Sequence, residues 1–379
     1  MRLSNSKFPI GLDISDYSLK VVQLVKKGKK AKIQAFGKID LEKGILDDGE
    51  IAQEDKFIEK VKKLLDNPKY GQITSNEVVA CLPESKTYIK LIKIEKGPNS
   101  ISDIIESEIE KNIPVSIKDI YYDYQIINED KNNFSVLMGA APINIVDRYI
   151  ETLKKLNLSV VAMEIESIAI ARSLLQEESP SFKETSSKNY CIIDIGAKRT
   201  SLTVYSKNTI VMSISISISG QEATEKISKT LEINTEQAEK AKIICGLDKE
   251  KAEGIIYDIL SEMINKLFEK IEETFDFYGN HYSDLGPINQ IILCGGGSGI
   301  KDFDKIINQK FLIDTRYGDF SFILSDNRDD LIKNFTETHK LNFKLSKDKK
   351  NSNIYAKQNS LLSYTTAIGL ALREVYIKK

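Results

Sequence analysis

Three short turns, far apart along the chain, have the residue types that could hold a chain of phosphates. They occupy residues 10–15, 192–197 and 293–299. Each turn follows a run of apolar residues, as a turn after a buried strand does, and each ends in small or polar residues. The backbone N–H groups of such turns form a concave cradle that binds anions without specific side chains. Together the three turns predict one split site for a ligand that carries phosphates.

The first two turns are alike, because each places an aspartate at the end of its strand. These are Asp13 and Asp194. A carboxylate beside phosphates is suited to hold Mg²⁺ through water, because Mg²⁺ keeps most of its hydration shell. Lys20 and Lys198 would add positive charge to the phosphates. In the third turn, the glycines of residues 295–299 would allow a flat base or a ribose to approach the backbone closely.

Each turn alone has an ordinary structural explanation, because an aspartate near a glycine after a strand is usually a hairpin turn and a glycine run is usually a flexible loop. Their joint presence and their order favour the ligand site. The chain has two histidines, His281 and His339, and we find no nucleophile–base pair of the Ser/His/Asp type in the sequence. Covalent catalysis of that type is therefore not expected.

The composition argues against several classes of protein. Lys and Arg together number 54 and Asp and Glu 55, so no net field draws the chain to nucleic acid or to acidic lipid. No run approaches the roughly 20 apolar residues that span a bilayer, and the N-terminus lacks the apolar core of a signal peptide. We therefore expect a cytoplasmic protein. A structural zinc site is not expected, because the cysteines are isolated: Cys81, Cys191, Cys245 and Cys294.

The elements that must position the turns follow from the apolar periodicity. The N-terminal segment predicts three strands, at residues 8–14, 19–25 and 32–39. A lysine-rich polar hairpin turn, residues 26–30, joins the second strand to the third. A helix with apolar positions between residues 57 and 65 and a buried strand at 78–82 come next.

From about residue 85 the pattern changes to a strand, a helix and two further strands. They are predicted at residues 88–94, 102–111, 120–127 and 134–140. This group is small and self-contained, so we expect a subdomain that interrupts the first lobe. Further elements follow it, namely a helix at 143–156, a strand at 159–163 and a helix that begins at Ser167.

The three-strand opening then recurs at residues 190–218, which indicates an internal repeat of topology. Residues 220–280 predict an almost wholly helical segment, and a strand at 288–294 leads into the third turn. A helix with Phe303 on its apolar face follows. An apolar helix is predicted at 361–375.

These elements predict an α/β fold with two lobes. The first lobe would comprise residues 1–84 and 142–184 with the helix 360–376, interrupted by the inserted subdomain 85–141. The second lobe would comprise residues 185–220 and 286–359, with a helical nucleotide-capping subdomain at 221–285. Residues 325–358 are polar and charged, so we expect a long loop or a partly disordered insertion there.

The chain resembles the actin-like ATPase superfamily, which includes actin, the Hsp70 chaperones, sugar kinases and FtsA, and within it the PilM family of type IV pilus assembly proteins. The resemblance runs from residue 8 to residue 376. It rests on motifs at residues 10–14, 19–24, 110–114, 164–172, 194–197, 220–222 and 293–298. It implies an actin-like (ribonuclease H-like) two-lobed fold, with an inserted small α+β subdomain of the FtsA and PilM type.

The resemblance also implies a role for each turn. Asp13 and Asp194 would flank Mg²⁺, and Glu166 would lie near the water that attacks ATP in hydrolysing relatives. The first phosphate turn would comprise Ser15, Asp16, Tyr17, Ser18 and Lys20. The second phosphate turn would comprise Gly196, Ala197, Lys198, Arg199 and Thr200. The loop around adenosine would comprise Gly295, Gly296, Gly297 and Ser298, bordered by Glu239 and Lys242.

The first phosphate turn departs from the family pattern. Ser15 stands where the family usually has glycine, and its Cβ narrows the approach of a phosphate. The Asp16 carboxylate would repel phosphate oxygens unless it contacts the metal. Lys198 and Arg199, in place of small polar residues in the second turn, would compensate. The sequence thus leaves two outcomes open, one in which ATP or ADP is bound and one in which binding is weakened or lost.

The resemblance implies a scaffold that responds to nucleotide, and at most a slow ATPase. In PilM proteins a groove beside the inserted subdomain takes up the short cytoplasmic N-terminus of the membrane protein PilN. Here that groove would contain Ile104, Ile105, Tyr121, Tyr122 and Tyr124. Tyrosines suit a peptide surface, and ordinary sheet packing explains them equally well. The scaffold would lie at the inner face of the cell membrane, in a type IV pilus or a related type II secretion system.

Further implied partners are a pilus ATPase, platform proteins and other copies of the chain. Two other functions stay open. An FtsA-like cell-division protein would carry an amphipathic membrane helix at its C-terminus, whereas this sequence stops at Lys379, directly after an apolar helix. An actin-fold kinase or ATPase would turn over rapidly with a metabolite, but no aspartate lies in an obvious substrate loop.

Overall fold

The structure is a computed structural model, and it describes residues 8–97, 100–113, 115–175, 188–326 and 360–377. Two compact units divide the chain. Unit 1 comprises Met1–Glu178, Thr203–Ile214 and Thr366–Lys379, and unit 2 comprises Ser179–Leu202 and Ser215–Thr365. Almost all of the predicted insertion at 325–358 lies outside the described residues.

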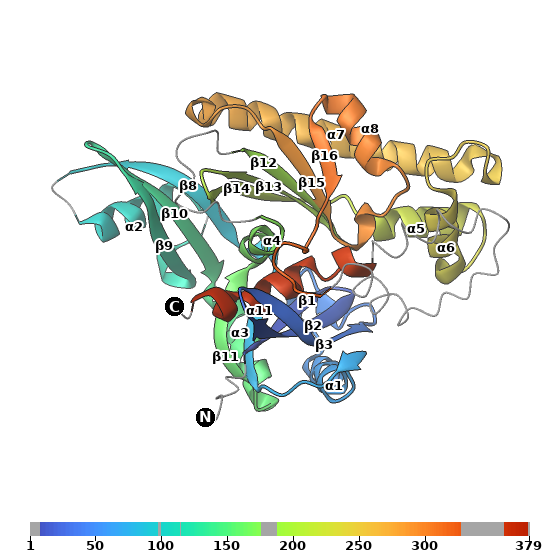
Figure 1. Cartoon of the computed structure of the whole chain (residues 1–379), viewed down its shortest axis with the longest axis horizontal. Helices are drawn as coiled ribbons and strands as arrows, with labels where there is room; N and C mark the ends of the chain where they lie inside the picture. The colour runs from blue at the N-terminus through green and yellow to red at the C-terminus, as the bar shows by residue number, and fades with distance from the viewer. Residues whose placement is uncertain (1–7, 98–99, 114, 176–187, 327–359, 378–379) are drawn as a thin grey trace. The chain divides into compact units, whose positions relative to one another are not determined.

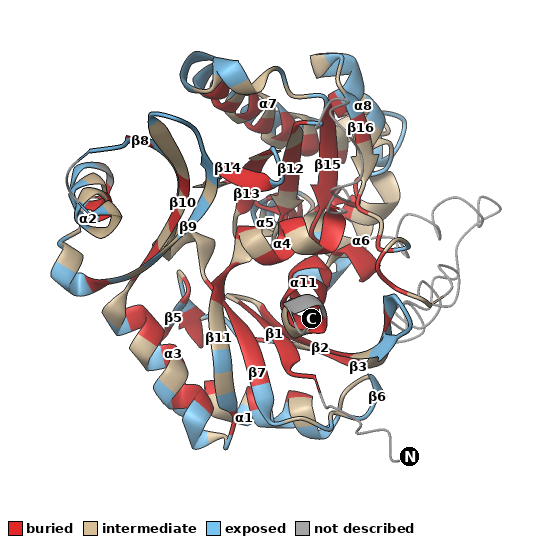
Figure 2. Ribbon diagram, turned by 60° about the vertical axis from the view of Figure 1, so that its left-hand side comes forward, coloured by how far each residue is buried: buried red, intermediate tan, exposed pale blue. Residues whose placement is uncertain are grey.

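Unit 1 contains a six-stranded sheet with the order β11-β7-β1-β2-β3-β6 (Figure 1). Its strands are β1 (Ile10–Ser15), β2 (Ser18–Lys27), β3 (Lys30–Asp40), β6 (Tyr70–Gly71), β7 (Glu77–Leu82) and β11 (Ser159–Ile165). Strand β1 runs antiparallel to β2 and parallel to β7. The central strands are buried on both faces, which explains why their sequences are nearly continuous apolar runs (Figure 2).

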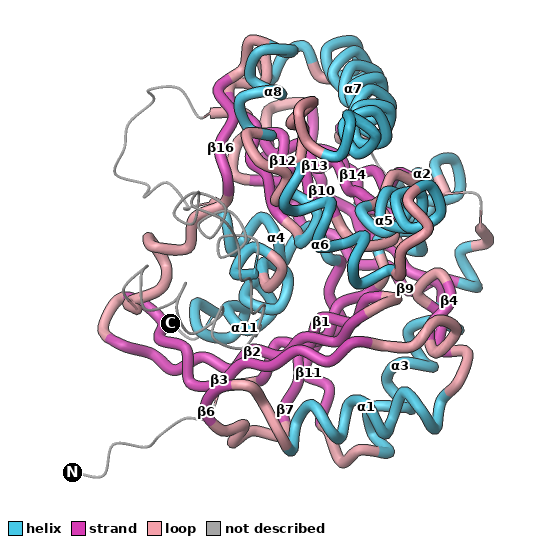
Figure 3. The backbone as a smooth tube through the Cα atoms, turned by 90° about the vertical axis from the view of Figure 1, so that its right-hand side faces the viewer, coloured by secondary structure: helices cyan, strands magenta, loops and turns pink. Residues whose placement is uncertain are grey.

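Helices cover both faces of this sheet (Figure 3). Helix α1 (Glu54–Asp66) and helix α3 (Ile143–Lys155) lie on one face, where Phe57 and Tyr149 join a core with Leu12 of β1. Helix α4 (Glu166–Leu174) and helix α11 (Thr365–Ile377) lie on the other face. Both α1 and α3 place apolar residues at helical spacing toward the sheet and charged residues toward solvent, the pattern of helices with one buried stripe.

Glycine lets helix α11 approach its neighbours closely. A Cβ at Gly11 of β1 would overlap the carbonyl oxygen of Ala367, and a Cβ at Gly369 would overlap the carbonyl oxygen of Ala169 on α4. The buried carboxylate of Glu164 then binds two arginines, Arg172 of α4 at 2.6 Å and Arg373 of α11 at 2.6 Å. Helix α11 is therefore held by backbone contact and by a shared ion pair.

The inserted part of unit 1 is a small α+β group, drawn in cyan and teal at the left of Figure 1. Strands β8 (Tyr88–Glu95), β10 (Asn133–Pro142) and β9 (Ile120–Glu129) pair antiparallel in that order, and β8 also pairs with β14 (Thr209–Ile216). Helix α2 (Ile101–Asn112) covers one face of these strands. Ser100 begins this helix as its N-cap, because its side chain accepts a hydrogen bond from the N–H of Asp103.

Unit 2 contains the parallel strands β12 (Tyr190–Ile195), β15 (Gln290–Cys294) and β16 (Asp314–Tyr317), in the order β16-β15-β12. Strand β13 (Thr200–Ser206) follows β12, and the boundary between the units crosses β13 and β14. The helices of unit 2 are α5 (Gly220–Thr230), α6 (Thr235–Cys245), α7 (Ile255–His281) and α8 (Phe303–Phe311).

The short strands β4 (Leu46–Asp47) and β5 (Glu50–Ile51) belong to unit 1.

The predicted strands and helices are confirmed apart from their ends, with one correction at the C-terminal helix. Residues 220–280 are almost wholly helical, as predicted, and form three helices separated by loops at 231–234 and 246–251 and a 3-10 turn at Ala252–Gly254. The segment between α6 and α7 contains Gly246, Ala252, Glu253 and Gly254, all with positive φ, a backbone conformation that ends a helix. The predicted helix at 361–375 is interrupted by a turn at residues 363–364 before α11 begins at Thr365.

Candidate functional site

In unit 1 the turn between β1 and β2 consists of Asp16 and Tyr17, because Ser15 pairs with Ser18. The same register places Asp13 directly opposite Lys20. Side chains that lie opposite each other on neighbouring strands are close enough to interact. Accordingly, the Lys20 Nζ atom lies 2.7 Å from the Asp13 Oδ2 atom, and both side chains are buried. The predicted metal carboxylate and the predicted phosphate lysine therefore neutralise each other.

Two further groups contact the Asp13 carboxylate. The hydroxyl of Ser15 donates a hydrogen bond to Oδ1 at 2.9 Å, and the thiol of Cys81 lies 3.8 Å from the same oxygen. Cys81 belongs to β7, the parallel neighbour of β1, and its sulfur accepts a hydrogen bond from the N–H of Ile14. Burial, followed by the charges of Asp13 and Glu166, raises the pKa of the Cys81 thiol well above its usual value. The thiol therefore stays protonated.

Nothing in the sequence marks Cys81 for this role, because it lies in an apolar run, where a free cysteine is usually a small core residue. The contact depends on the pairing of β7 with β1, and these strands are far apart in the sequence.

The Asp16 carboxylate is engaged within unit 1. Its Oδ1 atom accepts a hydrogen bond from the N–H of Gly49 at 3.1 Å, and the hydroxyl of Tyr149 donates to the carbonyl of Gly49 at 2.6 Å. The carbonyl of Tyr17 accepts a hydrogen bond from Leu41 at 2.9 Å. The turn is thus tied to the loops that follow β3 and to helix α3.

Glu166 is the first residue of helix α4 and is half-buried. Its carboxylate accepts a hydrogen bond from the Thr366 hydroxyl at 3.2 Å. Because its charge contributes to the raised pKa of the Cys81 thiol, it belongs to the same neighbourhood as Asp13. Unit 1 therefore brings together Asp13, Ser15, Lys20 and Glu166, with Cys81 as an addition.

In unit 2, Asp194 lies in strand β12 opposite Cys294 of the parallel strand β15. The next residue, Gly295, has a φ of +80°. A Cβ at Gly295 would overlap the Asp194 carboxylate, and a Cβ at Gly297 would lie 2.5 Å from the Cγ2 atom of Ile195. Both glycines are therefore required where the third turn passes over β12.

The second turn, residues 196–200, is closed by its own backbone and packs against the start of helix α5. The N–H of Gly196 donates to the carbonyl of Arg199 at 2.9 Å. The hydroxyl of Thr200, in the same turn, donates a hydrogen bond to the carbonyl of Ile218 at 2.7 Å. The carbonyl of Ala197 accepts a hydrogen bond from the N–H of Gln221 in the first turn of α5, at 3.1 Å.

Lys242 of helix α6 is buried and reaches the same place. Its Nζ atom donates to the carbonyl of Gly220 at 2.9 Å and to the Thr224 hydroxyl at 2.8 Å, and it lies 2.7 Å from the Glu239 carboxylate. A Cβ on Gly220 would lie 3.7 Å from the Cα atom of Gly297. Unit 2 therefore brings the second turn, the third turn and the Glu239–Lys242 pair together around the first residue of helix α5.

The described residues contain no group of three or more His, Cys, Asp or Glu side chains that could hold a metal ion. The donors present fit a metal held through water: each unit offers one carboxylate, and Asp13 is already bonded to Lys20 and Ser15. A hydrated Mg²⁺ needs only one or two carboxylates together with phosphate oxygens.

The predicted partner residues divide between the two faces of the inserted strands. Tyr122 and Tyr124 pack toward α2, where Ile105 is fully buried and Ile104 partly buried. Tyr121 lies on the opposite face, is 49% exposed and donates a hydrogen bond to Asp147 of α3 at 3.1 Å. Ile105 is thus a core residue, and Tyr121 is the most exposed of the five.

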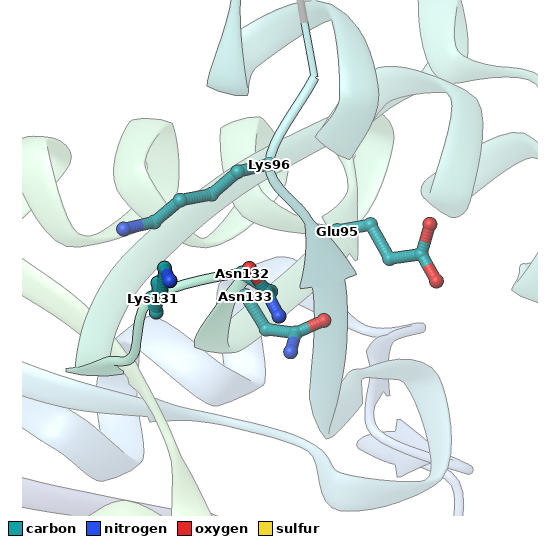
Figure 4. Close-up of a pocket in the computed structure, with 5 residues that line it drawn as sticks. All are labelled: Glu95, Lys96, Lys131, Asn132 and Asn133. Atoms are coloured by element: carbon teal, nitrogen blue, oxygen red, sulfur yellow. The ribbon is translucent and has the colours of Figure 1, made fainter.

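A depression of about 480 Å³ lies at the tip of the inserted strands. Its lining residues are Glu95, Lys96, Lys131, Asn132 and Asn133 (Figure 4). Their side chains do not converge, because Lys96 and Glu95 point in opposite directions. None of the predicted site residues lines it.

Comparisons with known proteins agree with the resemblance. The family model described as "Type IV pilus assembly protein PilM" matches residues 11–375. The chain belongs to this family. Among solved structures, the PilM-PilN type IV pilus biogenesis complex is similar with a TM-score of 0.75 and 19% identity, covering 97% of this chain and 98% of the other.

Two more distant likenesses accompany it. The ethanolamine utilization protein EutJ from Carboxydothermus hydrogenoformans has a TM-score of 0.50 at 12% identity, with 96% of this chain and 89% of EutJ covered. The cell division protein FtsA of Pseudomonas aeruginosa is 25% identical over 187 residues, which are 44% of this chain and 43% of FtsA. The match thus spans less than half the length of that relative. The predicted actin-like fold and PilM resemblance are confirmed.

In the described part of the chain, no helix combines the length and the apolar character that crossing a membrane requires.

Proposed function

We propose that this member of the PilM family is an ATP- or ADP-binding scaffold of a type IV pilus assembly platform. The observation that carries the nucleotide part is the convergence in unit 2 of two small-residue turns and a buried lysine around Gly220, at the first turn of helix α5. A helix N-terminus flanked by glycine turns favours phosphate, because N–H groups and the helix dipole point at the ligand.

We assign Glu239 and Lys242 to the border of the adenosine and residues 295–298 to its backbone contacts. The hairpin of unit 1, with Asp13 and Lys20, would contact the phosphates of the same ligand. Mg²⁺ would supply positive charge to the phosphates, held through water by Asp13 and Asp194. Glu166 would orient water, so that hydrolysis, where it occurs, is slow.

Calorimetric titration with ATP and with ADP, each with Mg²⁺ and with EDTA, tests the nucleotide part. Asp194→Asn keeps the shape of the side chain and should abolish the difference between Mg²⁺ and EDTA. Glu239→Gln should weaken binding about tenfold, the effect of losing one charged hydrogen bond.

Glu236→Gln is the matched control, because Glu236 lies on the same helix, is exposed and pairs only with Lys240 in the described structure. The affinity of this control variant for ATP and for ADP should equal that of the wild type. A folded wild type that binds neither nucleotide would contradict the nucleotide part of the proposal.

We further propose that the inserted part of unit 1 binds the cytoplasmic N-terminal peptide of a PilN-like membrane protein, which would hold the scaffold at the inner face of the cell membrane. Support comes from the solved PilM-PilN complex, which is similar to this chain over nearly its whole length. Strand β9 is the last strand of its sheet, and Tyr121 and Ile126 are exposed on it. An exposed sheet edge with an aromatic anchor is a common way to bind an extended peptide.

Fluorescence anisotropy with a synthetic peptide from the N-terminus of a PilN-like protein tests this part. Tyr121→Ala should weaken binding at least tenfold, as expected for an aromatic anchor. Tyr70→Ala is the matched control, because Tyr70 is similarly exposed but lies on strand β6 of the other sheet. Equal losses in both variants, or none in either, would contradict the assignment of Tyr121.

A further inference from the structure

The far end of the hairpin formed by β2 and β3 extends beyond the strands that pair with its base. Strand β1 pairs with β2 only as far as Gln23, and β6 pairs with β3 only at Ala35 and Phe36. Residues 24–33 therefore pair only with one another among the described strands. We call these ten residues the lysine ribbon, because five of them are lysines: Lys26, Lys27, Lys29, Lys30 and Lys32.

A β-bulge sets the direction of the ribbon. The register shifts where the ribbon leaves the sheet, so that Gln34 has no partner on β2. Its amide donates to the Thr74 hydroxyl at 2.8 Å and to the carbonyl of Gln72 at 3.2 Å. Bulges bend a strand and increase its twist, and they often re-aim side chains at functional places. The base of the ribbon is thus bent and anchored.

The ribbon has one buried face and one lysine face. Leu24, Ala31 and Ile33 share a face and are fully buried. Side chains alternate along a strand, so the pairs Val25–Lys32 and Lys27–Lys30 lie on the opposite face. Lys26 is paired with Ala31 and therefore lies at the outer end of the first face, where it is exposed. The turn has Gly28 with a φ of +64° followed by the exposed Lys29, as in a tight hairpin turn. The lysine face is therefore fixed outward by the packing of the other face.

Four exposed lysines of the ribbon carry charge that is not balanced locally. Within the residues that the structure describes, Lys26, Lys27, Lys29 and Lys32 are all exposed and take part in no ion pair. Like charges that lie directly or diagonally opposite on neighbouring strands destabilise the pairing. The near-zero net charge of the whole chain hides this local concentration of positive charge.

The chemistry of the lysine ribbon suits a ligand that presents many negative charges over an extended surface without a fixed arrangement. It has no aromatic residue and no arginine, so it offers neither a stacking platform for bases nor a bidentate fork for one phosphate. The sequence pI of about 6.3 is far below that of nucleic-acid-binding domains. The apolar residue of the lysine face, Val25, is small and half-buried, so this face offers no large anchor to a folded acidic partner.

We propose that the lysine ribbon binds the anionic headgroups of a phospholipid bilayer directly. Lysines suit this role because each is a point charge on a flexible stem and needs no fixed geometry in a fluid surface. Binding rests on Lys26, Lys27, Lys29 and Lys32, and it is independent of nucleotide and of a membrane-protein partner.

The test is co-sedimentation of the full chain with vesicles at low salt, comparing phosphatidylcholine alone with phosphatidylcholine containing phosphatidylglycerol. The wild type should bind the anionic vesicles and not the neutral ones, and binding should fall steeply with added salt. Each lysine near an anionic surface contributes about a fivefold increase in affinity. Changing Lys26, Lys27, Lys29 and Lys32 to glutamine together should therefore lower the affinity at least a hundredfold.

A matched control changes four other exposed lysines of unit 1 to glutamine: Lys43, Lys56, Lys62 and Lys63. It alters the net charge equally and should keep vesicle binding within a few-fold of wild type. Equal losses in the two quadruple variants would overturn the proposal, because binding would then follow net charge.

Three other outcomes would also overturn it. One is a wild type that does not bind anionic vesicles at low salt. Another is binding to single-stranded DNA without binding to vesicles, which would indicate a nucleic-acid surface. The third is loss of vesicle binding with inorganic phosphate but not with chloride at equal ionic strength, which would indicate a site for a free anion.

Discussion

At the scale of single residues, the ion pair of Asp13 and Lys20 is the most sensitive point of unit 1. Both side chains are almost fully buried. Removing one partner from a buried pair leaves an uncompensated charge, which destabilises a protein by about 3–5 kcal/mol. Lys20→Gln should therefore lower the free energy of unfolding by roughly this amount, measured by urea denaturation at pH 7.

The double variant Asp13→Asn with Lys20→Gln is the control for that prediction. It removes both charges, so most of the lost stability should return. A double variant as unstable as the single one would contradict the ion-pair explanation.

The carboxyl of Glu84 gives a prediction about pH. Burial raises its pKa above the usual value near 4.5, and hydrogen bonds from Ser213 and Ser167 lower it only in part. A carboxyl whose pKa is higher in the folded state than in the unfolded state stabilises the fold at pH values below its unfolded-state pKa. This stabilisation is lost as the pH rises through the folded-state pKa. Glu84→Gln should therefore unfold at a higher temperature than wild type at pH 7, because it has no charge to bury.

Thermal unfolding across pH measures this effect. The difference between Glu84→Gln and wild type should shrink toward zero as the pH falls to about 3, where the wild-type carboxyl is protonated in both states. A difference that does not change with pH would mean that lost hydrogen bonding, and not charge, separates the two proteins.

At this scale the sequence predicts which residues belong to the candidate site, because Asp13 ends a buried strand, Lys20 lies just after the first turn and the glycines form the third turn. Their mutual contacts could not be predicted, because those depend on strand register. A shift of one residue would separate Asp13 from Lys20. The thiol of Cys81 was missed for the same reason, since nothing local marks it.

At the scale of elements, the close packing of α11 gives a pair of predictions with opposite signs. Gly369→Ala should destabilise the protein by several kcal/mol, because its Cβ would overlap backbone of α4 that cannot move aside. Gly279→Ala, on helix α7, should stabilise it by roughly 0.5–1 kcal/mol, because no atom lies within 4 Å of the added Cβ and alanine favours helix.

Chemical denaturation of the two variants beside wild type measures both effects. Two shifts of the same sign would contradict the packing explanation, because helix propensity alone favours alanine at either position.

The elements themselves followed well from periodicity, and the failures were short or irregular. Strand β16 has four residues, too few for an alternating pattern to be recognised. The breaks in the helical segment of unit 2 occur partly at non-glycine residues with positive φ, Ala252 and Glu253, which carry no local signal for a turn. Strong periodicity marks a long element, whereas its interruptions depend on tertiary packing.

At the scale of the whole molecule, the chain passes between the units four times, at 178/179, 202/203, 214/215 and 365/366. Unit 1 is thus assembled from three separate segments, and its third segment supplies Leu370 to the core and Arg373 to the Glu164 pair. A chain that stops after residue 365 should lose amide-exchange protection in β1 and α4, because both lose the helix packed against them.

Hydrogen exchange followed by mass spectrometry measures this loss, with β15 of unit 2 as the internal reference. Unchanged protection of β1 in the shortened chain would show that α11 is not part of the cooperative core of unit 1.

The late position of helix α11 in the sequence has a consequence for synthesis on the ribosome. Every residue of unit 2 is made before the last segment of unit 1, although the first strands of unit 1 are the earliest to emerge. Until residue 377 has been added, the face of β1 around Gly11 has no helix to cover it. The nascent chain therefore carries an open apolar surface through most of its translation, the condition under which chaperones bind.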